Sequence, residues 1–464
     1  MPTPPEITTL SATELSQAYG NRHLSPVEVA RATLDHIEAE NPKVNAFALL
    51  DRESAYEAAR LSERRWARGE PLGPVDGVPA AVKDLLLAKG WPTLRGSLTV
   101  DADQSWEEDS PAVARLREQG AVLLGKTTTA EYGAKGATDT LRHGITRNPW
   151  NTAKTPGGSS GGAAVAAALG FGPIQIATDG GGSIRQPAAF TGLVGFKPSF
   201  GLVPGYPASF RGSLFHVGPI ARSVEDVALI LNSIARPDHR DWFALPHDGR
   251  DWRLGLEGGV EGLRIAFSPD LGYAEVDPEV AAIIAGAVSV FSDLGATVER
   301  ADPGFSDPYR LARGLSAAGA ARLVESLSPE RRAQAGPDLL AMAEDGLSID
   351  LDAYIGLNEE RAALGRRLNA FHLDWDLLVT PTTTAAAPDV EAKPARGAFT
   401  YPFNLTKQPA ISIPAGLTSA GLPVGLQIVG PRPHGDALVL RAARAFERAR
   451  PFTLPSRAKG GHHA

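Results

Sequence analysis

The sequence contains no cysteine, and this absence excludes several classes of site at once. Without thiols the chain has no disulfide framework, no thiol nucleophile and no thiolate ligand for a metal. It also lacks a sustained apolar block approaching the about 20 residues that a membrane-spanning helix needs. Residues 1–6 include neither a basic region nor an apolar segment, so no secretory signal is visible and a cytoplasmic location is the default expectation.

An excess of positive charge is also absent, because 46 Lys and Arg residues are outnumbered by 53 Asp and Glu residues, which gives a formal net charge of −7. No run of Lys or Arg with interleaved aromatic residues is present, so we expect no nucleic-acid partner. None of the ten histidines lies in a metal-binding pair such as H-E-x-x-H. We therefore predict neither a metal nor a cofactor. The 43% hydrophobic content indicates a globular chain with an ample core.

One stretch, residues 155–187, is rich in glycine and serine. It reads TPGGSSGGAAVAAALGFGPIQIATDGGGSIRQP. Two clusters, residues 157–162 and 180–183, bracket an apolar run of small residues. Glycine is favoured where the backbone needs φ > 0 or must approach another group closely. The clusters therefore predict N–H groups turned toward an anion or oxyanion. A flexible linker is a weaker interpretation, because the run between the clusters has the composition of buried helix and strand.

Two familiar motifs match this part of the chain by their letters only. Residues 157–161 fit the G-x-S-x-G nucleophile elbow, which needs a buried strand before it, whereas residues 147–154 have loop chemistry. Residues 120–127 fit the Walker A pattern of a phosphate-binding loop. There we predict that residues 111–119 are a helix and residues 121–124 the strand itself. The required order is inverted, and we reject the phosphate-binding loop.

Helices and strands alternate along most of the chain, which is typical of an α/β protein with a layered sheet. Two capping boxes, at Ser11 and Ser25, predict the first two helices, and we expect the second to run through Ile37. The helices within residues 11–70 should pack on the outside of the fold. Further helices are predicted at 53–68, 109–119, 277–294 and 436–448. Further strands are predicted at 263–267, 296–299, 377–379, 411–413 and 424–429, and the alternation of helix and strand also includes 223–234.

The 155–187 stretch closely resembles the signature of the amidase signature family, with its GGSSGG and GGSIR segments. Similar segments occur at residues 77–84, 120–127, 376–381, 404–414 and 421–430. The resemblance implies one large α/β/α domain around a mixed central sheet over residues 1–455, followed by a flexible tail at 456–464. In such a protein the helical segment 307–373, which carries no motif of its own, would line the substrate pocket.

The resemblance also implies the catalytic residues. Ser183 would be the nucleophile, and Ser159, on a cis peptide after Gly158, would connect it to Lys83 as the base. A serine hydroxyl needs a base within hydrogen-bonding reach, and a lysine can take that part if burial lowers its pKa. By itself, a lone lysine after an apolar strand usually lies at the surface. The resemblance and the serine clusters reverse that interpretation for Lys83.

The oxyanion hole would be formed by the backbone N–H groups of Gly180, Gly181, Gly182 and Ser183. Asp179, Arg185 and Ser160 would support the site, and we expect the first two to orient the loop rather than to react. If Lys83 is not the base, His143 and His216 are the first alternatives.

Three positions depart from the family pattern. Thr128 stands where asparagine is frequent, Lys407 where glycine is frequent, and Gly180 where a larger residue is common. None of them belongs to the triad, but each can alter the substrate pocket. The departures therefore concern the substrate rather than the mechanism.

Together these features predict a stand-alone serine hydrolase that cleaves the C–N bond of a small, neutral, apolar or aryl carboxamide through an acyl-enzyme. A carbamate (urethane) or ester hydrolase with the same triad remains open, as does the amidase-type subunit of a tRNA-dependent amidotransferase. A relative that only binds is disfavoured by the intact set of Lys83, Ser159 and Ser183. The expected partner is a small amide or carbamate, with no nucleic acid and no membrane, and a homodimer is left open.

Overall fold

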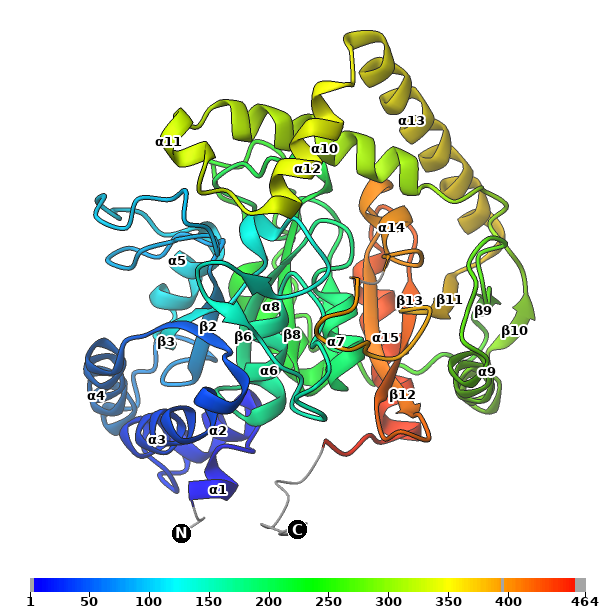
Figure 1. Ribbon diagram of the computed structural model, residues 1–464. Coiled ribbons are helices and arrows are strands. Elements are labelled where there is room, and N and C mark those ends of the chain that lie inside the picture. Colours follow the sequence, from blue (N-terminus) through cyan, green and yellow to red (C-terminus); the bar gives the residue numbers. More distant parts are fainter. Residues whose placement is uncertain (1–3, 394–395, 455–464) are drawn as a thin grey trace, which may run out of the picture.

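The computed structural model describes residues 4–393 and 396–454 of the chain. One mixed sheet of eleven strands runs through these residues, and helices lie against both of its faces (Figure 1). This arrangement confirms the predicted α/β class with a mixed central sheet. The strands of the sheet are β1 (Phe47–Leu50), β2 (Pro79–Lys83), β3 (Val122–Thr127), β6 (Ile174–Asp179), β7 (Val194–Lys197), β8 (His216–Ala221), β9 (Arg264–Phe267), β10 (Thr297–Arg300), β11 (Leu377–Pro381), β12 (Ala410–Leu417) and β13 (Pro423–Val429).

The helices form the outer layers, and a separate two-stranded sheet joins β4 (Asp139–Thr140) to β5 (Gly144–Ile145). The helices are α1 (Pro4–Ile7), α2 (Ala12–Gly20), α3 (Pro26–Val44), α4 (Arg52–Arg68), α5 (Pro111–Glu118), α6 (Gly161–Leu169), α7 (Arg185–Thr191), α8 (Val224–Ile234), α9 (Pro278–Asp293), α10 (Tyr309–Glu325), α11 (Pro329–Arg332), α12 (Pro337–Leu347), α13 (Leu351–Asp374), α14 (Tyr401–Leu405) and α15 (Gly435–Ala449), with two short 3-10 helices, η1 (Glu131–Gly133) and η2 (Gly212–Leu214).

The strand order in the sheet is β1-β3-β2-β6-β8-β7-β12-β13-β11-β9-β10. Strand β2 lies parallel to both β3 and β6, whereas β6 pairs antiparallel with β8. Since parallel neighbours end at the same edge of a sheet, Lys83 at the end of β2 and Asp179 at the end of β6 reach one edge together. The pairing thus brings two motifs that are distant in the sequence to one place.

Side chains that alternate along the strands fill two apolar layers. In β6, Ile174 and Ile176 belong to the core cluster that contains α8, whereas Ala177 packs with residues of α6 and α7 on the other face. Such alternation is expected of a sheet that helices cover on both sides. Burial of a side chain the size of isoleucine contributes about 1.5–3 kcal/mol relative to leaving it exposed.

The N-terminal helices begin where the sequence predicts. At Ser11 and Ser25 the hydroxyl accepts from the N–H three residues on, and the glutamate at that position accepts from the serine N–H, so both capping boxes are formed. The second of these helices, α3, does not stop at Ile37 as predicted but runs to Val44. Val44 and Ile37 belong to the same buried cluster, so the apolar face continues, and Asn45 ends the helix with a left-handed φ of 54°.

Residues 11–70 also contribute a strand, which the sequence does not predict. β1 pairs antiparallel with β3 and forms one edge of the sheet. Gly125 of β3 is required there, because a Cβ would overlap the carbonyl oxygen of Leu49. The region therefore extends the sheet as well as covering it.

The Walker A match at residues 120–127 is a coincidence of letters, as predicted. α5 ends at Glu118, Gly120 turns the chain with a φ of 78°, and Lys126 lies inside β3. The segment is helix, turn and strand, which is the reverse of a phosphate-binding loop.

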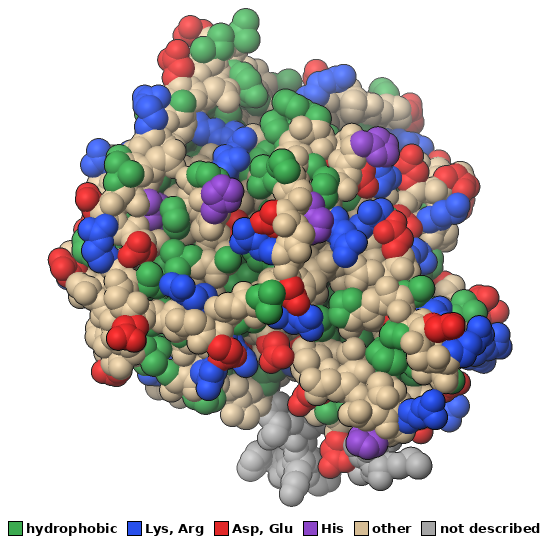
Figure 2. Space-filling view, turned by 180° about the vertical axis from the view of Figure 1, so that it is seen from behind, with side chains coloured by type: hydrophobic (Ala, Val, Ile, Leu, Met, Phe, Trp, Pro, Cys, Tyr) green, Lys and Arg blue, Asp and Glu red, His purple; other side chains and the backbone are tan. Residues whose placement is uncertain are grey.

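Helices α10 to α13 form a group at one end of the molecule, at the top of Figure 1, and confirm the predicted helical segment at 307–373. The predicted tail at 456–464 lies outside the described residues. No helix within residues 4–393 and 396–454 is long and apolar enough to cross a membrane. On the face seen in Figure 2, cationic and anionic side chains are interspersed rather than gathered into one basic surface.

Candidate active site

Lys83 closes the fully buried strand β2, and its ammonium group is buried as well. Its Nζ lies 2.7 Å from Ser159 Oγ, 2.7 Å from Ser160 Oγ and 2.9 Å from Thr178 Oγ1. All three neighbours are hydroxyl groups, and no carboxylate lies within ion-pair distance of Nζ among the described residues. The lysine is therefore buried among hydroxyl groups, without a described carboxylate close enough to pair with its charge.

Burial lowers the pKa of Lys83 well below its usual value of 10.5, and the nearby cation of Arg211 lowers it further, against the opposing charge of Asp179. A neutral amine has two N–H donors and one lone pair. Ser160 donates its hydroxyl hydrogen to the carbonyl oxygen of Thr178 at 3.1 Å, so its Oγ can only accept from Lys83. The lone pair is then left for the hydroxyl hydrogen of Ser159 or Thr178.

Ser159 is held in place by the first glycine cluster. The peptide bond between Gly158 and Ser159 is cis, as the family resemblance implies. A Cβ at Gly158 would lie 2.6 Å from backbone atoms of Ala137, and one at Gly162 would lie 2.5 Å from the nitrogen of Thr128. These glycines let the chain pass against neighbouring backbone before α6 begins at Gly161.

Ser183 follows β6 in the loop formed by residues 180–184, which we call the nucleophile loop. Its side chain is half-buried, whereas that of Lys83 is fully buried. No hydrogen bond links Ser183 Oγ to another side chain in the part of the chain that the structure describes. Thr178, which contacts Lys83, lies on the strand that precedes this loop, so Lys83 and the loop share one sheet edge.

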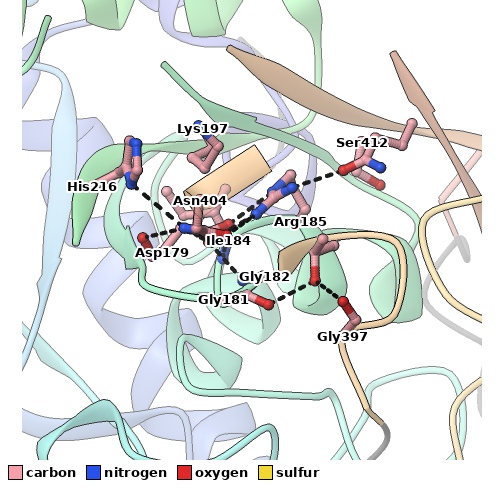
Figure 3. Close-up of polar contacts among 12 residues, drawn as sticks. Asp179, Gly181, Gly182, Ile184, Arg185, Lys197, His216, Gly397, Asn404 and Ser412 are labelled. Carbon is pink, nitrogen blue, oxygen red and sulfur yellow. Dashed lines mark hydrogen bonds and ion pairs between the residues drawn. The ribbon is translucent and has the colours of Figure 1, made fainter. Parts of the chain in front are cut away.

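Asp179 holds the nucleophile loop in place through hydrogen bonds (Figure 3). Its carboxylate accepts from the N–H of Gly182 at 2.6 Å and from the N–H of Ile184 at 3.2 Å. Arg185 donates to both carboxylate oxygens at 3.0 Å. Although burial by itself raises the pKa of Asp179, the Arg185 guanidinium holds that pKa far below its usual range. The carboxylate is thus a permanently charged acceptor, which suits orientation of the loop.

Two residues from the C-terminal half complete this network, and sequence reasoning did not single them out. Asn404 accepts from Arg185 at 2.6 Å and donates to Asp179 Oδ1 at 2.9 Å, and Gln427 accepts from Arg185 at 2.8 Å. A buried charge pair is costly unless its remaining donors and acceptors are satisfied. Asn404 and Gln427 supply those partners.

The oxyanion-hole prediction needs one correction. The N–H of Gly182 donates to Asp179, so it is not available to a substrate oxygen. Gly182 has a φ of 126°, which belongs to the region that favours glycine, and this conformation turns its N–H toward the carboxylate. Within the described residues, no contact occupies the N–H groups of Gly181 and Ser183. These two, together with Gly180, remain the candidate donors.

Each glycine of the loop also makes room for a neighbour. A Cβ at Gly181 would lie 2.5 Å from a ring carbon of Tyr401, and one at Gly182 would overlap the hydroxyl of Thr400. Thr400 in turn donates to the carbonyl oxygen of Gly181 at 2.6 Å. The loop is therefore packed against the start of α14.

Gly180 faces the side chain of Arg211, which explains its departure from the family pattern. A Cβ at Gly180 would overlap Arg211 Cδ. Arg211 donates to Ser316 Oγ at 2.7 Å and to the carbonyl oxygens of Gly133 and Ala134 at 3.2 and 3.0 Å. This arginine, another residue that the sequence did not indicate, connects the nucleophile loop to η1 and α10.

The other two departures have structural explanations of different kinds. Lys407 has a φ of 66°, a conformation that favours glycine, and its ammonium lies 4.4 Å from the ring centre of Phe200. Thr128 donates to backbone carbonyls of Asn45 and Ala46 and lies 2.7 Å from the hydroxyl of Thr146.

The two alternative histidines are not placed as bases for the serines. His216 Nδ1 lies 2.8 Å from the carbonyl oxygen of Leu214, and burial and the Lys197 cation lower its pKa well below 6.5. His143 Nε2 lies 3.7 Å from Asp84. Among the described contacts, neither ring reaches Ser159 or Ser183.

An open cavity of about 370 Å³ adjoins these groups. Leu85 and Tyr132 line it, and they flank Gly133, where a Cβ would lie 3.0 Å from Leu85 Cδ1 and 3.2 Å from Ser159 Oγ. Loop residues 207–210 and Phe215 line its second side, and α10 contributes the third. Gly133 therefore lies between Leu85, a wall residue of the cavity, and Ser159, and helix α10 of the 307–373 segment forms part of the cavity wall.

Comparison with known proteins identifies relatives along nearly the whole length. The family model described as Amidase matches residues 28–440. An acylamidase of Rhodococcus erythropolis is 38% identical over 466 residues, which cover 96% of each chain. A glutamyl-tRNA(Gln) amidotransferase subunit of Salinispora arenicola is 37% identical over 492 residues, which cover 97% of this chain and 99% of that one.

The fold has close counterparts among solved structures. A bacterial aryl acylamidase, described as a member of the amidase signature enzymes, superposes with a TM-score of 0.90 at 33% sequence identity. The superposition covers 95% of this chain and 96% of that chain. Sequence and fold therefore lead to the same group of proteins.

Proposed function

Because the chain belongs to the amidase signature family and hydrolyses the C–N bond of carboxamides, we propose that Lys83, Ser159 and Ser183 are its catalytic triad. One observation carries this proposal: the buried Nζ of Lys83 is surrounded by the hydroxyls of Ser159, Ser160 and Thr178 and has a strongly lowered pKa. A general base must be able to lose its charge at the working pH, and the lowered pKa of Lys83 favours its neutral form.

In the proposed reaction, Ser183 Oγ attacks the amide carbonyl while its proton passes to Ser159, whose own proton passes to Lys83. The resulting oxyanion accepts hydrogen bonds from N–H groups of the nucleophile loop. Lys83 then returns a proton through Ser159 to the amide nitrogen, which leaves as the amine. Water attacks the acyl-enzyme by the same route and releases the acid.

For the substrate we propose a small apolar or aryl amide, cleaved by this chain without other proteins. The acylamidase and aryl acylamidase similarities support this choice, and so do the rings of Tyr132, Phe210 and Phe215 along the cavity. A carbamate or ester would form the same tetrahedral oxyanion, and hydrolysis of urethanes remains part of the proposal. A homodimer and a cytoplasmic location remain predictions.

The triad is tested by covalent labelling. A sulfonyl or phosphonyl fluoride should add its mass to the peptide that contains Ser183, and Ser183→Ala should abolish hydrolysis while the far-UV circular dichroism is unchanged. Ser160→Ala serves as the matched serine control and should still be labelled at Ser183. Labelling of Ser159 in the wild type would refute the assignment of the nucleophile.

The stand-alone character is tested with the purified chain and a panel of aryl amides, alkyl amides, aryl carbamates and glutamine. We expect turnover of anilides by this chain alone. The similarity to glutamyl-tRNA(Gln) amidotransferase subunits makes glutamine hydrolysis the specific alternative. Activity confined to glutamine and dependent on added partner proteins would establish that alternative instead.

A further inference from the structure

The cavity lined by Leu85 and Tyr132, which Gly133 connects to Ser159, carries positive charge that amide hydrolysis does not require. Arg95 and Arg322 both line it. None of the side chains that line it is acidic; the others are Leu85, Tyr132, Pro207, Ala208, Ser209, Phe210, Phe215, Gly319, Leu323 and Ser326. A cavity lined by one sign of charge concentrates ligands of the opposite sign.

Arg95 has no acidic partner within 4.0 Å among the described residues. Its guanidinium lies 5.8 Å from the ring centre of Tyr132, on the cavity wall. A second cavity shares Arg95 and Tyr132 and does contain acids, but these have partners of their own. Asp101 pairs with Arg331 at 3.1 Å, Glu108 accepts from Tyr206 at 3.0 Å, and Glu107 accepts from Ser105. Arg95 is thus available to a ligand.

Arg322 approaches the same cavity from α10 and likewise forms no ion pair with a described residue. The side chain of Arg322 is exposed, so a ligand can reach it from solvent. Arg211 lies next to this region, but its nitrogens already donate to Ser316 and to two carbonyl oxygens. Arg211 therefore adds to the positive potential, whereas Arg95 and Arg322 have donors to offer.

The aromatic wall and the cations divide the cavity into two kinds of surface. Tyr132, Phe210 and Phe215 suit a flat or apolar body, and Arg95 and Arg322 suit the planar two-oxygen geometry of a carboxylate. We propose that this cavity binds an anionic group of the substrate, so that the preferred amides carry a carboxylate on the part away from the scissile bond. This inference rests on the proposed amidase function, and it replaces the neutral substrate that the sequence predicts.

Two matched series of substrates test the proposal. One compares 4-carboxyacetanilide with 4-methylacetanilide, and the other compares the monoanilide of succinic acid with butyranilide. We expect the carboxylate to raise kcat/KM at least about tenfold in one series, which corresponds to about 1.4 kcal/mol of binding. The preference should shrink at high salt, because an exposed arginine is screened.

The variants Arg95→Gln and Arg322→Gln should each reduce that preference severalfold, measured as the ratio of kcat/KM for the charged and the neutral partner of each pair. Arg310→Gln, which removes a cation of α10 that lines neither cavity, is the matched control and should leave the preference unchanged. Arg322→Glu should turn the preference toward a substrate with a 4-aminomethyl group.

Equal kcat/KM for the charged and neutral substrates in both series would overturn the anion site while the amidase function stands. So would a carboxylate preference that persists in the double variant Arg95→Gln/Arg322→Gln. Failure of the wild-type chain to cleave any of the four anilides would instead refute the proposed aryl amidase function, a separate result.

Discussion

Two buried lysines at the ends of neighbouring parallel strands have different surroundings. Lys83 at the end of β2 contacts three hydroxyls, whereas Lys126 in β3 lies 3.5 Å from the carboxylate of Asp84 and donates to Leu86 and Thr93. Both side chains are fully buried. Burial lowers the pKa of Lys126 to about 8 against the opposing charge of Asp84, and it lowers the pKa of Lys83 well below its usual value of 10.5.

The difference shows what turns a buried lysine into a base. Desolvation acts on both groups, but Lys126 has a carboxylate within ion-pair distance, whereas Lys83 has only the more distant charges of Asp179 and Arg211. Lys126 keeps its charge near neutral pH and ties β3 to the chain after β2, which is a structural task. The lowered pKa of Lys83 favours its neutral form, which is the form that the proposed base needs. The hydroxyl set around Lys83 is the chemical feature that matters.

The largest effect should come from removing one lysine and not the other. Lys83→Met keeps the stem but removes the base, so kcat/KM for an anilide should fall by several orders of magnitude. Activated esters, whose leaving groups need no proton, should lose less. Lys126→Met should keep kcat/KM of the folded fraction within about tenfold. Steady-state kinetics on both variants, with folding monitored by circular dichroism, decides the comparison.

The next effect should come from giving Lys83 the kind of neighbour that Lys126 has. Thr178→Asp would place a carboxylate where a hydroxyl now lies 2.9 Å from Nζ. An opposite charge favours the protonated amine, so the pKa of Lys83 should rise and the acid limb of kcat/KM should move to higher pH. At neutral pH we expect a loss of about tenfold to a hundredfold.

Thr178→Val is the control for this change, because it removes the hydroxyl without adding charge. It should lower the rate at every pH and move the acid limb far less than the aspartate does. An aspartate variant with the wild-type pH profile would mean that Lys83 is not the titrating base.

The reverse comparison concerns stability. Lys126→Met leaves the buried carboxylate of Asp84 without its cation, which typically costs about 3–5 kcal/mol in the free energy of unfolding. Lys83→Met leaves only hydroxyls behind and should cost less. Urea unfolding at pH 7 measures both values. The double variant Lys126→Met/Asp84→Asn should recover part of the loss, and no recovery would exclude the unpaired carboxylate as its cause.

The lowered pKa of Lys126 also predicts how the stability of the fold depends on pH. The pKa of Lys126 is about 8 in the folded chain and about 10.5 as its ordinary value, so the unfolded chain binds more protons between these values. Stability therefore rises with pH in that window wherever this lysine is present. Wild type should gain stability relative to Lys126→Met between about pH 8 and pH 10.5, and parallel curves would contradict the lowered pKa.

Much of this arrangement is visible in the sequence, because local chemistry fixes it. The capping boxes at Ser11 and Ser25, the strand that ends at Lys83 and the inverted order around Gly120 all depend on neighbours in the chain. The layered α/β architecture follows from alternation of helices and strands, whereas the mixed character of the sheet is what the family resemblance implies. β1 was missed, since a four-residue edge strand between two helices has little pattern of its own.

The contacts that complete the site join distant segments and leave no local signal. Asn404 reaches Asp179 from 225 positions away, and Arg211 reaches Ser316 across 105 positions. Thr178 had a weak signal, as a polar residue in a buried strand directly before the nucleophile loop. The use of the Gly182 N–H by Asp179 depends on loop geometry, which glycine content alone does not specify.

The smallest effect should come from Arg211, the cation that lowers the pKa of Lys83 in addition to burial. The charge of Asp179 opposes this effect and raises the pKa of Lys83. The pKa of Arg211 is itself lowered by burial and by Arg313 and raised by Tyr401 and Asp179. Arg211→Met removes the cation, so protonated Lys83 becomes less costly and the acid limb of kcat/KM should move to higher pH. Below the midpoint we expect a loss of about threefold to tenfold, with little change on the high-pH plateau. Arg211→Lys restores a positive charge and should bring the limb back. If Arg211 acted only by holding Gly180 in place, both variants would lower the plateau and leave the limb where it is, so the full pH profile distinguishes charge from packing.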